Sequence, residues 1–503
     1  MAKQYVLAHD VGTTGNKATL YSTNGELINS AFFGYETNYP HSGWAEQNPS
    51  DWWKAVCETT KKLVSEKNIN REEIAAVSFS GQMMGALPVD RDGNPLQHSI
   101  IWADMRAEEQ ASQLEQQLSM EYVYKVTGHR ISSSYSGAKI KWLKDNRPEV
   151  YQKTYKFLQA KDYLAFKMTG VFVTDYSDAC GTNCFDIVNK VWSKEIIDAW
   201  DLDEEVFPDA CASTDVIGSV TNQAAEETGL LKGTPVVIGA GDGVCAAAGV
   251  GVMDHGEAFN YIGSSSWVAV ASDEPVFDPE MKTYTWVHLD PTKYSPNGTM
   301  QTGGGSMQWV TQLLYGHLKL DKYDVMNEEA SKSPLGSNKL LFLPYLMGER
   351  SPRWNPDARG AFVGLSITHD RGDMARAVME GVAFNLKVVL DTFRNSGIPI
   401  EKMWVLGGGA KSVLWRQILA DIYQLDIEVP SYLEEATSMG AAMAGAVGSG
   451  AIKDFQEAKK WVKRVSTHDP DVKNKSKYEA LYEIFNDTYE QLVPIYTKLK
   501  QFN

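Results

Sequence analysis

Two aspartates come shortly after apolar runs, and small residues lie close behind each of them. Asp10 follows the run 5–8 and opens the turn DVGTTG at 10–15, whereas Asp242 lies in GAGDGVCAAAG at 239–249. The amides and threonine hydroxyls of a turn such as 10–15 can cradle a phosphate, with Lys17 offsetting its charge. The carboxylate of Asp10 suits Mg²⁺, because that ion prefers oxygen ligands. A plain hairpin explains this turn equally well, so both interpretations stay open at this point.

The loop around Asp242 also permits two interpretations. Gly241, Gly243 and Ala246 fit the spacing G-x-G-x-x-A of a dinucleotide-binding turn. An acid would then occupy the tight turn that a pyrophosphate must approach, and the two negative charges would repel each other. We therefore interpret Asp242 as a general base that accepts a proton from an attacking hydroxyl.

Three further glycine-rich turns follow apolar runs: GSSSW at 263–267, TGGGSMQW at 302–309 and GGGAKS at 407–412. The free N–H groups of such turns can approach an anion or a purine closely. One turn of this kind is more often structural, but four in one chain, counting 10–15, favour a phosphate site. No GxxxxGK[ST] motif is present, which excludes a Walker-type nucleotide site.

Two polar segments, SGQMMG at 80–85 and IIWADMR at 100–106, carry the groups that a polyol needs. Gln82, Asp104 and Arg106 offer mixed donors and acceptors. Trp102 offers a flat face for a carbon skeleton. The methionine pair at 83–84 is more typical of core packing than of ligand binding.

Strands that alternate with helices must position these loops. We expect strands over 5–8, 18–21, 75–79 and 235–238, and a helix over 49–64. Strands over 259–262 and 268–271 flank a hydroxyl-rich turn and repeat the pattern of 5–21, which suggests a loose internal duplication. This alternation predicts an α/β fold with ligands at the ends of strands.

Composition narrows the possible partners and compartment. The 503 residues carry 48 basic and 64 acidic side chains, a formal charge of −16. This balance argues against nucleic acid or an anionic membrane as a partner, since both attract clustered Lys and Arg. Five scattered cysteines predict no disulfide framework, and no uninterrupted apolar run is long enough to span a bilayer. We therefore expect a reduced, cytoplasmic protein.

In this order, the loops resemble those of the FGGY carbohydrate kinases, most closely the xylulokinase branch. The resemblance extends from Asp10 to about Gly448. Residues 134–146 (SYSGAKIKWLKDN) fit the first signature of the family, and residues 360–380 fit the second. GERSP at 348–352 and GGGAKSVLWRQILAD at 407–421 are also close to the xylulokinase pattern.

The resemblance implies two actin-like, ribonuclease-H-like domains around a central cleft that holds ATP, Mg²⁺ and an open-chain ketose or polyol. The expected N-terminal domain is 1–250, with the sugar side and the first phosphate loop. The expected C-terminal domain is 251–503, the nucleotide side, with a last helix at 475–500 packing back. Four phenylalanine or tyrosine residues spaced by four, three and four from 478 to 489 predict that helix.

Matching positions imply roles for individual residues. Asp242 matches the catalytic base, and Asp10 belongs to the metal and phosphate loop, so both are expected to hold the metal. With Lys17 added on the charge argument, the residues expected at ATP are Gly12, Thr13, Thr14, Lys17, Gly263, Ser264, Gly304, Gln308, Gly408 and Gly409. The residues expected at the substrate are Gln82, Met83, Met84, Trp102, Asp104, Arg106 and Asp242.

The sequence departs from the xylulokinase pattern at two positions. That branch usually has SGQMHG, and an Asn after the catalytic Asp, where this chain has Met84 and Gly243. Both changes remove hydrogen-bond partners that face the sugar. A site built to bond a hydroxyl discriminates strongly through such groups, so we expect an altered substrate choice.

The resemblance implies transfer of the ATP γ-phosphoryl to a terminal hydroxyl of a ketopentose, foremost D-xylulose to give D-xylulose 5-phosphate. Ribulose, L-xylulose, erythrulose, a hexulose, glycerol or gluconate stay open as substrates. A sugar-independent actin-like ATPase would share the phosphate loops without the polar segments. An NAD-dependent dehydrogenase should have an acid for the ribose about twenty residues beyond the glycine turn, and this chain has no good match there. A homodimer is the expectation for the family, with no metal beyond nucleotide-bound Mg²⁺.

Overall fold

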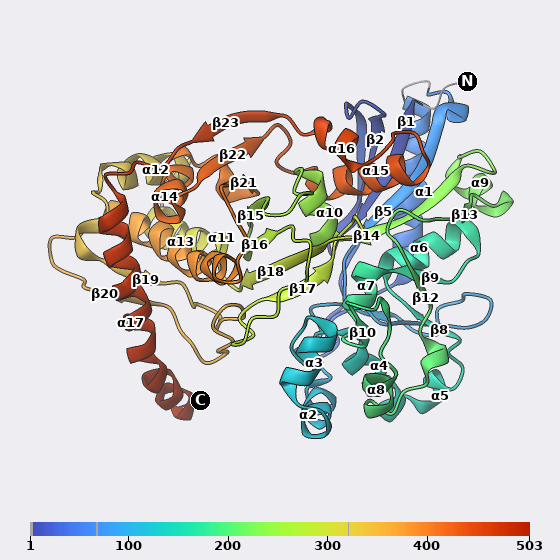
Figure 1. The fold of residues 1–503 in the computed structure, drawn as a ribbon, viewed down its shortest axis with the longest axis horizontal. Helices are drawn as coiled ribbons and strands as arrows, with labels where there is room; N and C mark the ends of the chain where they lie inside the picture. Colours follow the sequence, from blue (N-terminus) through green and yellow to red (C-terminus); the bar gives the residue numbers. More distant parts are fainter. Residues whose placement is uncertain (1–3, 67–68, 320, 503) are drawn as a thin grey trace.

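Two β-sheets, each covered by helices, make up the chain in the computed structural model, which describes residues 4–66, 69–319 and 321–502 (Figure 1). The first sheet has the strand order β13-β14-β5-β1-β2-β3. Its strands are β1 (Tyr5–Val11), β2 (Gly15–Ser22), β3 (Leu27–Gly34), β5 (Ile74–Gly81), β13 (Val216–Ser219) and β14 (Pro235–Gly241).

Three parallel strands bring the chemically interesting loops to one edge of this sheet. β5 runs parallel to both β1 and β14, so their carboxyl ends meet at the same edge. Asp10 pairs with Ser80 in one register, and Gly81 pairs with Gly241 in the other. The loops that begin at residues 12, 82 and 242 therefore start side by side.

The second sheet repeats the order of the first. Its order is β17-β18-β16-β15-β21-β22-β23. The strands are β15 (Ala258–Ile262), β16 (Ser266–Val270), β17 (Tyr284–Val287), β18 (Tyr294–Met300), β21 (Lys402–Leu406), β22 (Asp426–Pro430) and β23 (Arg464–His468). β15, β16 and β18 pair as β1, β2 and β3 do, and β21, β22 and β23 pair as β5, β14 and β13 do. The predicted α/β class and internal duplication are confirmed.

Most of the predicted elements are present, and several extend beyond the predicted range. The predicted helix at 49–64 is α1 (Pro49–Glu66), and the final helix is α17 (Lys475–Leu499). The remaining helices are α2 (Glu108–Gln117), α3 (Met120–Thr127), α4 (Ser136–Asn146), α5 (Pro148–Tyr151), α6 (Ala160–Thr169), α7 (Tyr176–Cys180), α8 (Lys194–Ala199), α9 (Asn222–Thr228), α10 (Asp242–Gly249), α11 (Gly304–Tyr315), α12 (Lys322–Lys332), α13 (Arg371–Asn395), α14 (Val413–Tyr423), α15 (Ala436–Gly448) and α16 (Phe455–Ala458).

Small two-stranded ribbons join the larger elements. They are β4 (Glu46–Gln47) with β7 (Ser99–Ile100), β6 (Leu87–Val89) with β8 (Lys156–Leu158), β9 (Val173–Asp175) with β12 (Asp209–Cys211), β10 (Phe185–Asp186) with β11 (Val191–Trp192), and β19 (Leu341–Leu343) with β20 (Ala361–Val363). The five cysteines are free thiols in this structure. Across the residues that the structure describes, no helix is both long and apolar enough to cross a membrane.

A helix from late in the sequence covers the first sheet. α15 packs against α10, β1, β5 and β14, and Figure 1 shows it in orange beside the blue strands β1 and β2. Glycines allow a close approach here, since a Cβ at Gly440 would lie 2.0 Å from the carbonyl oxygen of Cys245. A Cβ at Gly249 would lie 1.8 Å from the carbonyl oxygen of Ala436. A division of the chain at residue 250 stays a prediction.

Enlarging Gly440 tests this helix contact. In Gly440→Ala the new methyl overlaps fixed backbone, and we expect a loss of about 1–3 kcal/mol in the free energy of unfolding. This loss outweighs the gain of up to about 1 kcal/mol from better helix propensity. Gly34→Ala is the control, because the nearest atom to its Cβ is 3.6 Å away. Urea unfolding measures both, and equal midpoints for the two variants would contradict the tight contact.

Candidate active site

Asp10 is held by donors from two distant parts of the chain. Ser80 Oγ donates to its Oδ1 at 3.1 Å, and Thr437 Oγ1 donates to its Oδ2 at 2.5 Å. Burial raises the pKa of Asp10, although both hydrogen bonds and the charge of Lys17 oppose that shift. Thr437 lies on α15, 427 residues away, and no sequence motif identifies it. The position of the Asp10 carboxylate therefore depends on the packing of α15 against the first sheet.

Asp242 begins α10, directly after the end of β14. Within the described residues its carboxylate accepts one hydrogen bond, from Gly243 N at 2.7 Å. Burial and the charge of Asp10 raise the pKa of Asp242 to about 7. A carboxyl group with this pKa can accept a proton near neutral pH, which suits a general base.

Both aspartates line one cavity, which we call the carboxylate pocket, with a volume of about 410 Å³. Its lining residues are Asp10, Gly12, Asp242, Gly243, Ala246, Tyr261, Trp267, Leu406, Gly407, Gly408, Leu433, Glu434, Ala436 and Thr437. This volume lies in the range of small-molecule sites. The stacked rings of Tyr261 and Trp267, with centroids 4.2 Å apart, form part of its wall. The pocket thus joins residues from both sheets.

Lys17 is engaged at the edge of this pocket. Its Nζ donates to the carbonyl oxygen of Glu434 at 3.2 Å and to Oε1 of Glu435 at 3.4 Å. The ammonium group therefore ties β2 to the start of α15. It would have to leave or share Glu435 to neutralise a phosphate.

Two of the three glycine-rich turns predicted in the second half, at 263–267 and 302–309, lie against each other. Gly304 N donates to the carbonyl oxygen of Gly263 at 2.7 Å, and Gly305 N donates to that of Ser264 at 2.9 Å. A Cβ at Gly304 would lie 2.3 Å from the Gly263 oxygen, so only glycine allows this approach. Gln308 is exposed on α11 and lies outside the lining of the carboxylate pocket.

Some of the remaining residues predicted to bind ATP line the pocket, and the others lie outside its lining. Gly12 and Gly408 line the pocket. Gly409 packs on the side chain of Ile262, where a Cβ would lie 2.4 Å from Cγ2. Thr14 is exposed, and the carbonyl oxygen of Thr13 accepts a hydrogen bond from Gln47 Nε2 at 2.7 Å.

A second cavity of about 590 Å³ lies between the halves, and we call it the aromatic cleft. Its lining residues are Met84, Trp102, Ala103, Met105, Arg130, Ser132, Ser134, Tyr135, Tyr284, Trp286, Thr299, Gln301, Met347, Glu349, Arg350, Trp354 and Pro356. Trp102 is 38% exposed, and its Nε1 donates to Thr13 Oγ1 at 2.9 Å. Burial and, more weakly, the charge of Asp242 raise the pKa of Tyr284. These contacts place the cleft next to the carboxylate pocket.

One buried lysine holds three loops of this cleft together. Lys139 Nζ donates to the carbonyl oxygens of Met84 at 2.8 Å, Ile101 at 2.8 Å and Ser134 at 2.6 Å. Burial lowers the pKa of Lys139 to about 7, although the charge of Asp104 opposes that shift. The sequence motif contains this lysine but gives no sign of its structural role.

The three residues of the segment 82–84 lie in different environments. Met84 lines the aromatic cleft with φ 61°, a left-handed conformation that is uncommon for a residue with a side chain. Met83 is buried and packs on Gly241. Gln82 Nε2 donates to Gln47 Oε1 at 2.7 Å and does not line the cleft. Gln47 in turn donates to Thr13, so Gln82 supports the turn at 10–15.

Asp104 and Arg106 bind each other and are not part of the cleft lining. Arg106 donates to both carboxylate oxygens of Asp104, and its Nη2 also donates to Glu46 at 2.8 Å. Its guanidinium lies 3.7 Å from the centroid of the Trp44 ring, and its side chain is 2% exposed. This closed network fixes the loop that carries Trp102.

The donor set of the carboxylate pocket fits a Mg²⁺ ion. No cluster of three or more His, Cys, Asp or Glu side chains that could hold a metal occurs in residues 4–66, 69–319 and 321–502. Mg²⁺ usually takes one or two carboxylates, with waters and phosphate oxygens completing its shell. Asp10 and Asp242, two carboxylates in one cavity, provide that number.

Comparison with known proteins extends over both halves. Residues 5–249 match the N-terminal domain of the FGGY family of carbohydrate kinases, and residues 258–449 match its C-terminal domain. The xylulose kinase of Bacillus subtilis (strain 168) is 31% identical over 99% of this chain and 99% of that protein. A crystal structure of xylulose kinase from Rhodospirillum rubrum has a TM-score of 0.93 and 26% identity, covering 98% of this chain and 100% of that one. A gluconate kinase from Lactobacillus acidophilus has a TM-score of 0.92 and 29% identity, with 98% and 99% coverage.

Titration of Asp242 makes stability depend on pH. Its pKa is about 7 in the folded protein against an ordinary value of 3.8, so between these values the folded state binds more protons. Stability therefore falls as pH rises through this window, and the loss is complete above pH 7. Asp242→Asn removes the titration. Relative to the unmodified protein, we expect the free energy of unfolding of this variant to rise by about 1–2 kcal/mol between pH 5 and pH 8. The rise is smaller than the full pKa shift implies, because solvent in the pocket screens part of the effect.

Urea unfolding at several pH values measures that difference. The two proteins share every other titrating group, so contributions from those groups largely cancel. A stability difference that stays constant from pH 5 to pH 8 would contradict the raised pKa.

Proposed function

The chain belongs to the FGGY family of carbohydrate kinases, and on that premise we propose that it transfers the γ-phosphoryl group of ATP to a terminal hydroxyl of a ketopentose. The foremost substrate is D-xylulose, which gives D-xylulose 5-phosphate. The observation that carries this proposal is the pairing of Asp10 and Asp242 in one pocket beside the aromatic cleft.

Asp242 is the proposed general base. The sugar hydroxyl approaches from the aromatic cleft, and the Asp242 carboxylate accepts its proton as the oxygen attacks phosphorus. The pKa of about 7 supports this role, since the carboxylate is half ionised at that pH and basic enough to take the proton. Phosphoryl transfer requires mainly positioning and charge stabilisation, which loops of this kind supply.

ATP would lie in the carboxylate pocket, between the aspartates and the glycine turn at 407–409. Exposed backbone at Gly408 allows close approach of a planar ring or a phosphate. Bound Mg²⁺, held by Asp10 and Asp242, would neutralise charge on the phosphate oxygens. The turn at 12–14 stands beside it, and Trp102 connects that turn to the cleft.

The sugar would occupy the aromatic cleft. The rings of Trp102 and Trp286 offer faces for its carbon chain, and Arg130, Gln301 and Glu349 offer polar partners. Met84 stands in this lining, so the chain offers a thioether where the xylulokinase branch usually has an imidazole.

Gluconate is the second candidate substrate. The gluconate kinase of Lactobacillus acidophilus has the same fold over 98% of this chain. Arg130 and Arg350 both line the aromatic cleft, and the buried Nε of Arg350 has no hydrogen-bond partner within the described residues. A sugar acid would supply a carboxylate for such a group.

A substrate panel tests the proposed function. We expect ADP release from Mg·ATP to be stimulated strongly by D-xylulose and weakly or not at all by L-xylulose, D-ribulose, L-ribulose, D-fructose, erythrulose and glycerol. Stimulation by gluconate alone would replace the first candidate with the second. ATP hydrolysis that is indifferent to every sugar would contradict the kinase and favour an actin-like ATPase.

Removing the proposed base should nearly abolish turnover. Loss of a general base costs about 10²–10⁴ in rate, and we expect Asp242→Ala to lose kcat in this range. Asp321→Ala is the control, because Asp321 caps α12 on the surface and lies in neither cavity. Steady-state assays with saturating ATP and sugar compare the two. Retention of most sugar-dependent turnover by Asp242→Ala would remove its assignment as the base.

A further inference from the structure

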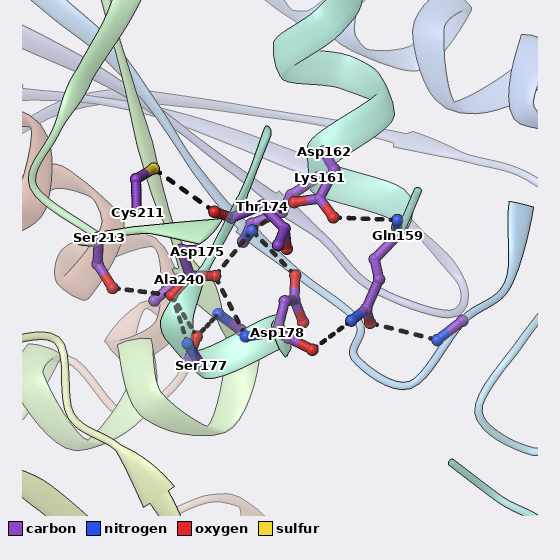
Figure 2. Close-up of polar contacts among 12 residues, drawn as sticks. Gln159, Lys161, Asp162, Thr174, Asp175, Ser177, Asp178, Cys211, Ser213 and Ala240 are labelled. Carbon is purple, nitrogen blue, oxygen red and sulfur yellow. Dashed lines mark hydrogen bonds and ion pairs between the residues drawn. The ribbon is translucent and has the colours of Figure 1, made fainter. Parts of the chain in front are cut away.

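A buried cluster of charged groups lies behind the proposed base, outside both cavities. Lys161 Nζ lies 2.7 Å from Asp162 Oδ1, 2.8 Å from Asp175 Oδ1 and 3.0 Å from Asp178 Oδ2 (Figure 2). The four side chains are at most 1% exposed. They come from α6, the end of β9 and α7, so the cluster joins three elements.

One ammonium group faces three carboxyl groups here. Burial alone would lower the pKa of Lys161, but the three carboxylates hold it well above its usual value. Burial raises the pKa of Asp178 well above the ordinary range, and the nearby carboxylates add to that shift. The lysine is therefore held in its charged form, while burial opposes ionisation of Asp178 beside it. Buried ion clusters of this kind contribute little to the net free energy of unfolding, so stability alone does not account for this cluster.

A chain of hydrogen bonds connects the cluster to the turn that carries Asp242. Ser177 Oγ donates to Asp175 Oδ2 at 2.6 Å and accepts from Gly241 N at 2.9 Å. Because the amide can only donate, the serine oxygen must accept from it and direct its own proton to the carboxylate. Figure 2 shows Ser177 close to Asp175 and to Ala240, the residue that precedes Gly241.

A second path connects the same cluster to the loop at 82–85. Gln159 Nε2 donates to the carbonyl oxygen of Asp178 at 2.5 Å, and its Oε1 accepts from Gly85 N at 3.3 Å. The cluster also supports the end of β5, since a Cβ at Gly81 would lie 2.9 Å from Lys161 Cβ. Gly81 and Gly241 are partners in the sheet register, so both paths end at the same edge.

We propose that the cluster of Lys161, Asp162, Asp175 and Asp178 positions the general base, with Ser177 as the link to the backbone of Gly241. The inference rests on the proposed function, in which Asp242 accepts the proton of the sugar hydroxyl. Ser177 and Asp175 are positioning residues, because no atom of theirs lines either cavity. The path through Gln159 fixes the loop of Met84 against the same cluster.

Two serines provide a matched pair for the test. Ser177 Oγ and Ser213 Oγ both donate to Asp175 Oδ2, at 2.6 Å and 2.8 Å, and both side chains are buried. Of these two hydroxyls, only that of Ser177 also accepts a hydrogen bond from Gly241 N among the described contacts. Ser177→Ala and Ser213→Ala therefore remove equivalent hydrogen bonds to the carboxylate, and they differ in the link to the base.

We expect Ser177→Ala to lower kcat about tenfold or more, since misplacing a reacting group by about 1 Å can cost up to 10²-fold. KM for ATP and sugar should change less than about threefold, because both cavities are intact. Ser213→Ala should keep kcat within about threefold, with a smaller fall in melting temperature than Ser177→Ala, which also leaves the Gly241 amide without its acceptor. Ser177→Cys keeps the shape with a weaker acceptor, and its kcat should fall between those of the unmodified protein and Ser177→Ala.

The outcomes separate this inference from the proposed function. Equal kcat in Ser177→Ala and Ser213→Ala, or a loss expressed only in KM, would overturn the positioning role. If Ser177→Ala does not fold, Ser177→Cys decides by the same comparison with Ser213→Ala. Absence of sugar-dependent turnover in the unmodified protein would overturn the proposed function itself, independently of both serines.

Discussion

Two carboxylates kept in one pocket, largely removed from bulk water, are the constraint on which the site depends. Burial raises the pKa of both Asp10 and Asp242, and the charge of Asp10 raises that of Asp242 further. The protein compensates only in part, with hydroxyl donors on Asp10 and one backbone amide on Asp242. A cation bound between them, or a proton taken up by one, would relieve what remains. The pocket is therefore prepared for a change of charge.

The duplicated sheets explain how a single site obtains different chemistry from two similar halves. β1 and β15 occupy equivalent places, yet the turn after β1 adjoins an acid and the turn after β15 carries glycine and hydroxyl groups. The first half thus contributes both aspartates, and the second contributes Glu434, backbone and aromatic walls such as Tyr261. Neither half alone encloses the carboxylate pocket, because Thr437 and Gly408 from the second half complete its lining.

Local patterns predicted strands, turns and both aspartates, because apolar runs followed by small residues report on what lies next in the chain. Such patterns do not predict which residues come into contact after folding. Asp104 and Arg106 have the types of ligand-binding residues, but their charges are satisfied by each other, which no spacing reveals. Thr437 has no motif at all, and its hydrogen bond to Asp10 exists only because α15 returns to the first sheet.

The late position of α15 in the sequence affects how the first half can fold during synthesis. A ribosome completes β1, β5 and β14 by residue 241, but α15, which covers them, is not complete until residue 448. During the synthesis of some two hundred intervening residues, part of the apolar face of the first sheet has no native partner. The first half therefore cannot reach its final packing until α15 has been synthesised. The carboxylate pocket can therefore form only late in the synthesis of the chain.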